Sequence, residues 1–78
     1  MQITLLSYLE GTPPVFRNPE YGARLQRQCI EEFALYGTYL TFEDALRALY
    51  ASHLGTGFQF ARCEVTGQYL LFDKRAFM

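Results

Sequence analysis

Hydrophobic residues recur every three or four positions in the stretch TFEDALRALYASHLG, and this spacing predicts an amphipathic helix. Thr41, followed three residues later by Asp44, is a variant of the capping box that begins helices. Gly55 follows the last hydrophobic position, where a glycine commonly ends a helix. We therefore expect a helix over residues 42–54.

A second helix is predicted upstream, over residues 19–36. Asn18 can cap its first turn, and Pro19 suits the first helical position because a missing N–H costs nothing there. Gly37 stands where a left-handed residue would end this helix. Gly22 lies within its first turns and costs the helix about 1 kcal/mol relative to alanine.

The remaining hydrophobic runs predict three strands, at residues 2–9, 58–65 and 68–74. In the first of them the Leu5-Leu6 doublet breaks the period of two, which indicates a bulge or a strand covered on both faces. Thr66-Gly67 predicts a hairpin turn between the other two, because glycine readily takes a positive φ. The short segment GTYL between the helices is either extended or a plain connection.

These elements predict one α+β domain over residues 1–78, with the order β-α-α-β-β. We expect two helices packed on one face of a three-stranded antiparallel sheet, which leaves the other face uncovered. The hairpin register divides the residues of its two strands between these faces. The residues expected to face the helices are Ala61, Cys63, Leu70 and Phe72.

Composition adds a reason to look for a binding surface. Half of the 78 residues are hydrophobic and 17% are aromatic, yet a chain of this length buries only about 60–65% of its unfolded surface. Some hydrophobic side chains should therefore remain at the surface, either scattered or gathered into a patch that meets a partner. The predicted protein-binding residues, on the uncovered sheet face, are Phe60, Arg62, Tyr69 and Leu71. The alternative is that the loop at residues 13–17 or the C-terminal AFM covers this face.

Charge and targeting features limit the classes of partner and the cellular locations that the sequence favours. The net charge of −1 does not favour nucleic-acid binding through a broad basic surface. The N-terminal segment lacks the features of a secretory signal, and no hydrophobic run approaches the ~20 residues of a membrane span. Two widely separated cysteines are typical of reduced thiols, although a Cys29–Cys63 disulfide stays open. We expect a cytoplasmic protein.

Residues with catalytic or metal-binding chemistry are sparse. The single histidine, His53, is expected in the last turn of the second helix, where a cation is favoured and the ring can pack. Cys29 and Cys63 fall on inward faces, and nothing near them resembles a nucleophile with its base. The spacing of these three residues matches no zinc site. We therefore predict no catalytic, cofactor-binding or metal-binding residues.

Three features describe the general build of the chain: the strand QITLLSYL, the capped helix TFEDALRALYASHLG and the closing hairpin FARCEVTGQYLLF. In this build the chain resembles small phage-encoded inhibitors of the anti-CRISPR kind. The resemblance covers the whole chain but includes no specific motif, so it transfers no functional residue. It implies a stoichiometric inhibitor that occludes a surface of a larger host complex.

The sequence therefore predicts a non-enzymatic protein-binding module, an inhibitor or adaptor without a cofactor. The alternative is a homodimeric structural or regulatory module of a bacterial cytosolic protein, which closes its hydrophobic surplus by self-association. A small enzyme is a third class, with less support from the residues.

Overall fold

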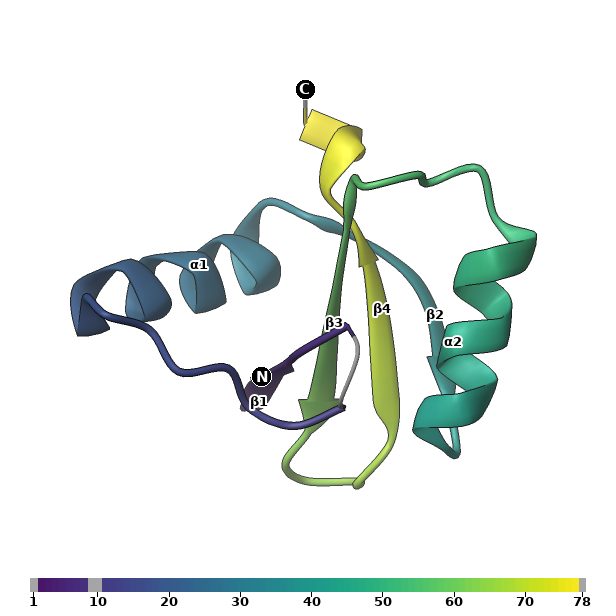
Figure 1. The fold of residues 1–78 in the computed structure, drawn as a ribbon, viewed down its shortest axis with the longest axis horizontal. Coiled ribbons are helices and arrows are strands. Elements are labelled where there is room, and N and C mark those ends of the chain that lie inside the picture. Colours follow the sequence, from purple (N-terminus) through teal and green to yellow (C-terminus); the bar gives the residue numbers. More distant parts are fainter. Residues whose placement is uncertain (1, 9–10, 78) are drawn as a thin grey trace.

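Four strands form one antiparallel sheet in the order β1-β3-β4-β2, and one helix lies on each of its faces (Figure 1). The structure is a computed structural model that describes residues 2–8 and 11–77. Its elements, in chain order, are β1 (Ile3–Leu6), α1 (Pro19–Glu31), β2 (Ala34–Tyr39), α2 (Phe42–Ala51), β3 (Phe58–Cys63), β4 (Tyr69–Asp73) and the short 3-10 helix η1 (Lys74–Phe77). Among these residues no helix has both the length and the hydrophobic character that crossing a membrane requires.

The α+β class is confirmed, but the strand number and the placement of the helices were predicted wrongly. The sheet has four strands because the segment between the helices forms β2 and pairs with β4. Helix α1 ends at Glu31, not at residue 36, and Glu32 is its C-cap. Two adjacent carboxylates at the negative end of the helix dipole, with no basic residue in the last turn, disfavour continuation to Gly37.

Each face of the sheet has its own hydrophobic core, which is why the helices cannot share one face. The core beneath α1 consists of Ile3, Leu5, Cys29, Ala61, Leu70 and Phe72. The core beneath α2 consists of Leu6, Ala45, Leu49, Leu54, Phe60 and Leu71. Leu5 and Leu6 therefore face opposite cores. Of the two predicted explanations for the doublet, a bulge or a strand covered on both faces, the second is confirmed. Leu9, the predicted end of that strand, lies outside the described residues.

The N-terminal caps of both helices are confirmed. The Asn18 side chain accepts a hydrogen bond from the Glu20 backbone N–H at 2.9 Å, and the Thr41 hydroxyl accepts one from the Asp44 N–H at 3.1 Å. At its other end α2 stops at Ala51, earlier than predicted. These two N-caps therefore define where each helix begins.

The hairpin register differs from the predicted one by two residues. The Cys63 N–H donates to the Gln68 carbonyl at 2.8 Å, so the turn is longer than the predicted Thr66-Gly67 pair. Side chains alternate between faces with a period of two, and an even shift leaves every residue on its predicted face. Ala61, Cys63, Leu70 and Phe72 accordingly all contribute to the core beneath α1, as predicted.

Candidate protein-interaction surface

The four predicted binding residues share one face of the sheet, but helix α2 covers that face. Phe60 is 1% exposed and Leu71 is fully buried. The ring of Phe42, in the first turn of α2, meets the Phe60 ring edge-on at a centroid distance of 5.0 Å. Phe60 and Leu71 therefore belong to the core and were assigned wrongly to a contact surface. Of the two predicted alternative covers, the loop at residues 13–17 lies beside β1 and α1 instead, on the other face of the sheet. The C-terminal AFM includes Met78, which lies outside the described residues.

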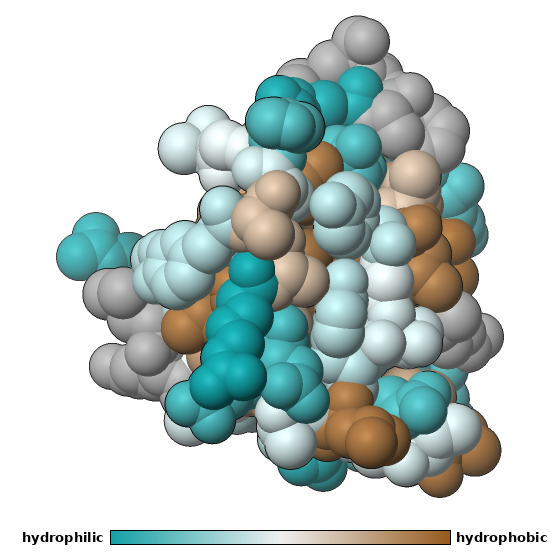
Figure 2. Space-filling view, turned by 90° about the vertical axis from the view of Figure 1, so that its right-hand side faces the viewer, coloured by the Kyte–Doolittle hydropathy of each residue, from teal (hydrophilic) through white to brown (hydrophobic). Residues whose placement is uncertain are grey.

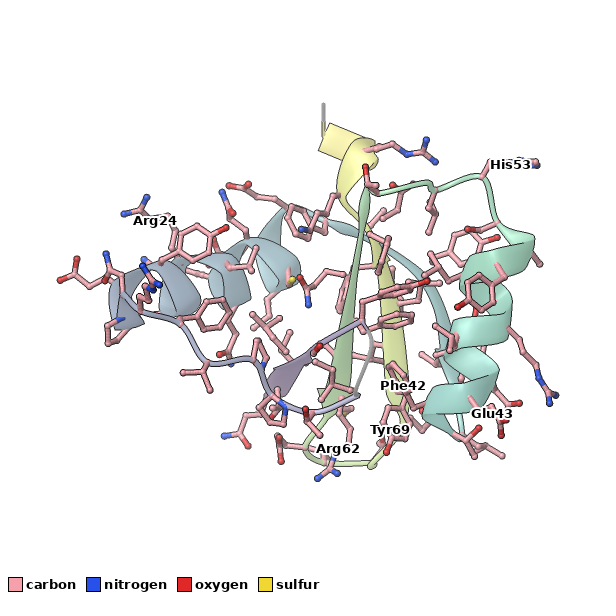
Figure 3. All side chains as sticks on the ribbon, viewed as in Figure 1. Arg24, Phe42, Glu43, His53, Arg62 and Tyr69 are labelled. Atoms are coloured by element: carbon pink, nitrogen blue, oxygen red, sulfur yellow. The ribbon has the colours of Figure 1, made fainter. Side chains whose placement is uncertain are left out.

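Arg62 and Tyr69 lie at the hairpin end of the sheet and remain accessible (Figure 3). They are opposite each other on β3 and β4, and the Tyr69 ring contacts Phe42 at 6.1 Å. Figure 2, which faces the α2 side, shows hydrophobic side chains in separate areas rather than one continuous patch. Without Phe60 and Leu71, this pair provides too little hydrophobic area for the predicted surface.

A different surface is exposed along β2, the strand at the far edge of the sheet. β4 pairs with one side of β2, and no strand within residues 2–8 and 11–77 pairs with the other side. The eight residues from Ala34 to Thr41 include no charged side chain. Three large hydrophobic residues here are exposed: Leu35 is 49%, Tyr36 is 48% and Leu40 is 77% accessible. We call Leu35–Leu40 the β2 edge.

The register explains why the β2 edge is accessible. Leu35 lies opposite Phe72, and Thr38 lies opposite Leu70. Opposed residues of an antiparallel pair point to the same face of the sheet, and Leu70 and Phe72 both point towards α1. Helix α1, however, packs over the β1 end of the sheet. The β2 end of that face is therefore left without a helix.

The two edges of the sheet differ in how they are protected. At β1 the Gln26 side-chain amide donates to the Ile3 carbonyl at 2.8 Å and so occupies an edge acceptor. Pro13, Pro14 and α1 border a groove of about 470 Å³ along the same strand. β2 carries neither a proline nor a charge, and within the described part of the chain the feature that interrupts this edge is a bulge between Leu35 and Gly37. The β2 edge is the more open of the two.

A second hollow, of about 610 Å³, lies between the end of β1 and the C-terminal end of α2. Its lining consists of Tyr8, Leu49, Tyr50, Ser52, Gly55, Thr56 and Phe58. The Tyr8 hydroxyl donates to the Tyr50 hydroxyl at 3.2 Å, and this bond raises the pKa of Tyr8. Among the described residues, the lining supplies aromatic rings and hydroxyl groups.

His53 does not occupy the last turn of α2. Ser52 caps the helix by donating its hydroxyl to the Leu49 carbonyl at 2.7 Å. His53 follows the cap and points into solvent (Figure 3), while its carbonyl accepts a hydrogen bond from Arg75. Leu54 takes the buried position beyond the helix. The predicted packing of the His53 ring is thus wrong, and the hydrogen bond that His53 makes with Arg75 uses its backbone carbonyl.

The two cysteines are free, and their environments differ. Burial raises the pKa of the Cys29 thiol to about 11, against a smaller opposing effect of Lys74. Hydrogen bonds from the Thr66 hydroxyl and from the backbone N–H groups of Thr66 and Val65 lower the pKa of Cys63. Among the described residues no three His, Cys, Asp or Glu side chains form a group that could hold a metal ion.

In the folded protein, iodoacetamide is expected to modify Cys63 and to spare Cys29. The thiolate is the nucleophile, and a thiol with a pKa of about 11 is only ~0.1% thiolate near pH 8. Peptide mass spectrometry after timed alkylation measures both rates, and in urea both cysteines should react. Equal rates in the folded protein would contradict the burial of Cys29.

Sequence reasoning missed β2 although its residue types contained a signal. Tyr36, Thr38 and Tyr39 all favour strands, and the whole segment is uncharged. Residues 34–36 were predicted as the end of the upstream helix because Gly37 resembles a helix terminator, and of the two alternatives for GTYL, extended or a plain connection, the structure has the extended one up to Tyr39. Comparisons with protein-family models, with curated proteins and with solved structures give no match for this chain.

Proposed function

We propose that this protein is a non-enzymatic protein-binding module, most concretely a small stoichiometric inhibitor or adaptor that occludes a surface of a larger protein complex. The observation that carries the proposal is the β2 edge, an open and uncharged strand edge with three exposed hydrophobic side chains. The inhibitor form of the proposal also rests on the resemblance in build to phage-encoded inhibitors. A cytoplasmic location, where free thiols persist, belongs to the same proposal.

An open strand edge is suited to protein binding for two physical reasons. Its outward N–H and C=O groups can hydrogen-bond an added strand, which supplies affinity, while alternate side chains supply specificity. An unprotected edge is also a liability, because it can pair with unintended strands. A partner that occupies the β2 edge would remove this liability and cover Leu35, Tyr36 and Leu40.

The alternative form of the proposal is a homodimeric structural or regulatory module that uses the same edge. An enzyme is less well supported, because the larger hollow offers rings and hydroxyl groups and the Cys29 thiol has a raised pKa. Direct nucleic-acid binding is likewise not proposed for a chain with a net charge of −1.

Site-specific photo-crosslinking tests the proposed surface. A benzophenone amino acid replaces Leu40 in one variant and Val65 in a matched control, since these residues are 77% and 79% exposed. In cells that produce the protein, the Leu40 variant is expected to give one discrete protein adduct with a yield about tenfold above the control. Additional Thr38→Pro should abolish it, because proline removes an outward N–H from the β2 edge.

The mass of the adduct separates the two forms of the proposal. An adduct of twice the 9.0 kDa chain is expected for self-association, and any other discrete mass identifies a foreign partner. Equal, diffuse labelling at Leu40 and Val65 would show that the β2 edge is ordinary solvent-exposed surface, and the protein-binding proposal would then be wrong.

A further inference from the structure

We infer that the β2 edge pairs with the β2 edge of a second copy of this chain, antiparallel, about a two-fold axis at Thr38. This inference rests on the alternative, homodimeric form of the proposed function, in which the partner of the β2 edge is a second copy of the chain. It joins two four-stranded sheets into one continuous sheet and removes the open edge from both copies.

The first step establishes which residues of β4 direct their backbone groups towards β3 and which direct them towards β2. The Cys63 N–H on β3 donates to the Gln68 carbonyl, just before β4 begins. Along an antiparallel strand, successive residues direct their backbone groups to alternate neighbours. Tyr69 and Leu71 therefore direct theirs away from β3 and towards β2.

The second step follows on β2 itself. Tyr39 lies opposite Tyr69, and Gly37 lies opposite Leu71, so both β2 residues direct their backbone groups towards β4. Thr38, between them, directs its N–H and C=O outwards from the sheet. Its side chain is also exposed. Thr38 can thus exchange two backbone hydrogen bonds with Thr38 of a second copy.

The position of the two-fold axis is limited by the ends of the regular strand. The bulge occupies Leu35 to Gly37, and β2 ends at Tyr39. An axis at residue 36 would lie in the bulge, and an axis at Leu40 would pair the strand with the start of α2. An axis at Thr38 keeps the pairing within the β2 edge and places Tyr36 opposite Leu40 of the partner on both sides of the axis.

The side chains of the paired edges are compatible with identical partners. No residue from Ala34 to Thr41 is charged, so self-pairing brings no like charges together. Because the β2 edge has no charged side chain, a foreign partner could not recognise it through charge complementarity. Because a two-fold axis perpendicular to the sheet preserves its faces, Leu35, Tyr36 and Leu40 of both copies lie on the face that α1 leaves uncovered.

Two variants with opposite charges at the axis test the pairing. Thr38→Lys and Thr38→Glu each place like charges directly opposite each other in a self-paired dimer, and each is expected to weaken self-association about tenfold or more. An equimolar mixture of the two should restore a dimer that contains one chain of each kind, because opposite charges then meet at the axis. Sedimentation velocity measures the mass, and native mass spectrometry identifies the mixed species.

Matched controls carry Val65→Lys and Val65→Glu, at an exposed residue of the hairpin turn. They should associate like the unmodified chain, alone and mixed. Circular dichroism confirms that each variant is folded, as expected for changes at exposed positions. Self-association of the unmodified chain should be reversible and visible in the micromolar range.

Three outcomes would overturn the inference. They are a monomer at all concentrations up to ~1 mM, unaltered dimers of both Thr38 variants, and weakened variants whose mixture stays monomeric. If the chain is monomeric but the Leu40 crosslink gives a foreign adduct, only the self-pairing is wrong and the protein-binding function stands. If the crosslink fails as well, both are wrong.

Discussion

Replacement of Phe60 by alanine is expected to lower the free energy of unfolding by about 3–5 kcal/mol. The ring is 1% exposed, and three aromatic rings pack around it. Its neighbours are Phe42 at 5.0 Å, Phe58 at 5.4 Å and Tyr8 at 6.4 Å between centroids. Truncation removes these contacts and leaves a cavity between α2 and the sheet. Urea denaturation followed by circular dichroism measures the loss.

Val65→Ala is the matched control for this loss. Val65 is hydrophobic but 79% exposed, so its truncation should change stability by no more than about 0.5 kcal/mol. A loss below about 1 kcal/mol for Phe60→Ala would mean that the ring is not enclosed. Helix α2 would then not cover this face, and the contact surface predicted from the sequence would be restored.

The position of Phe60 shows what the sequence pattern could establish and what it could not. Alternation along the hairpin grouped the residues into two faces correctly, even though the turn was misjudged, because the register differs by an even number of residues. Alternation does not say which face meets water, since that depends on where the helices pack. The run Leu70-Leu71-Phe72 was the better guide, because three consecutive hydrophobic residues are typical of a strand buried on both faces.

The strand β2 was missed because local signals conflicted. Gly37 resembles a helix terminator, but in the structure it lies within β2, where a Cβ atom would collide with the Tyr39 hydroxyl. The Glu31-Glu32 pair was the opposing signal, since acidic residues are unfavourable at the end of a helix. Pairing with β4, a contact between residues 30 to 39 positions apart in sequence, decides the outcome. Local propensity does not contain that information.

The sequence predicted that large hydrophobic side chains would be exposed, but it did not predict where in the fold they would lie. The hydrophobic surplus correctly indicated that large hydrophobic side chains would remain exposed, and Leu35, Tyr36 and Leu40 do so. Their location depends on two tertiary facts: β2 lies at the edge of the sheet, and α1 packs over the opposite end. Composition alone therefore indicated exposed hydrophobic side chains, and the sheet order places the candidate surface on β2.

Gly22→Ala is expected to destabilise the protein, although alanine is the better helix former. Gly22 is buried in α1, and a Cβ atom there would lie 2.7 Å from Cδ2 of the Phe16 ring. Forcing extra volume into a packed site costs about 1–3 kcal/mol, and improved helix propensity returns about 1 kcal/mol. The expected net loss is up to about 2 kcal/mol, measured by urea denaturation.

The sign of this effect should reverse when the ring is removed. In a Phe16→Ala background the added methyl group meets no ring, so Gly22→Ala should stabilise the protein by about 1 kcal/mol. Ala23→Gly, at the neighbouring exposed position of α1, calibrates the propensity difference. If Gly22→Ala has the same effect in both backgrounds, the Phe16 ring does not pack against Gly22. The glycine would then have no packing role, because the close approach of the Phe16 ring is what requires a residue without a side chain at this position.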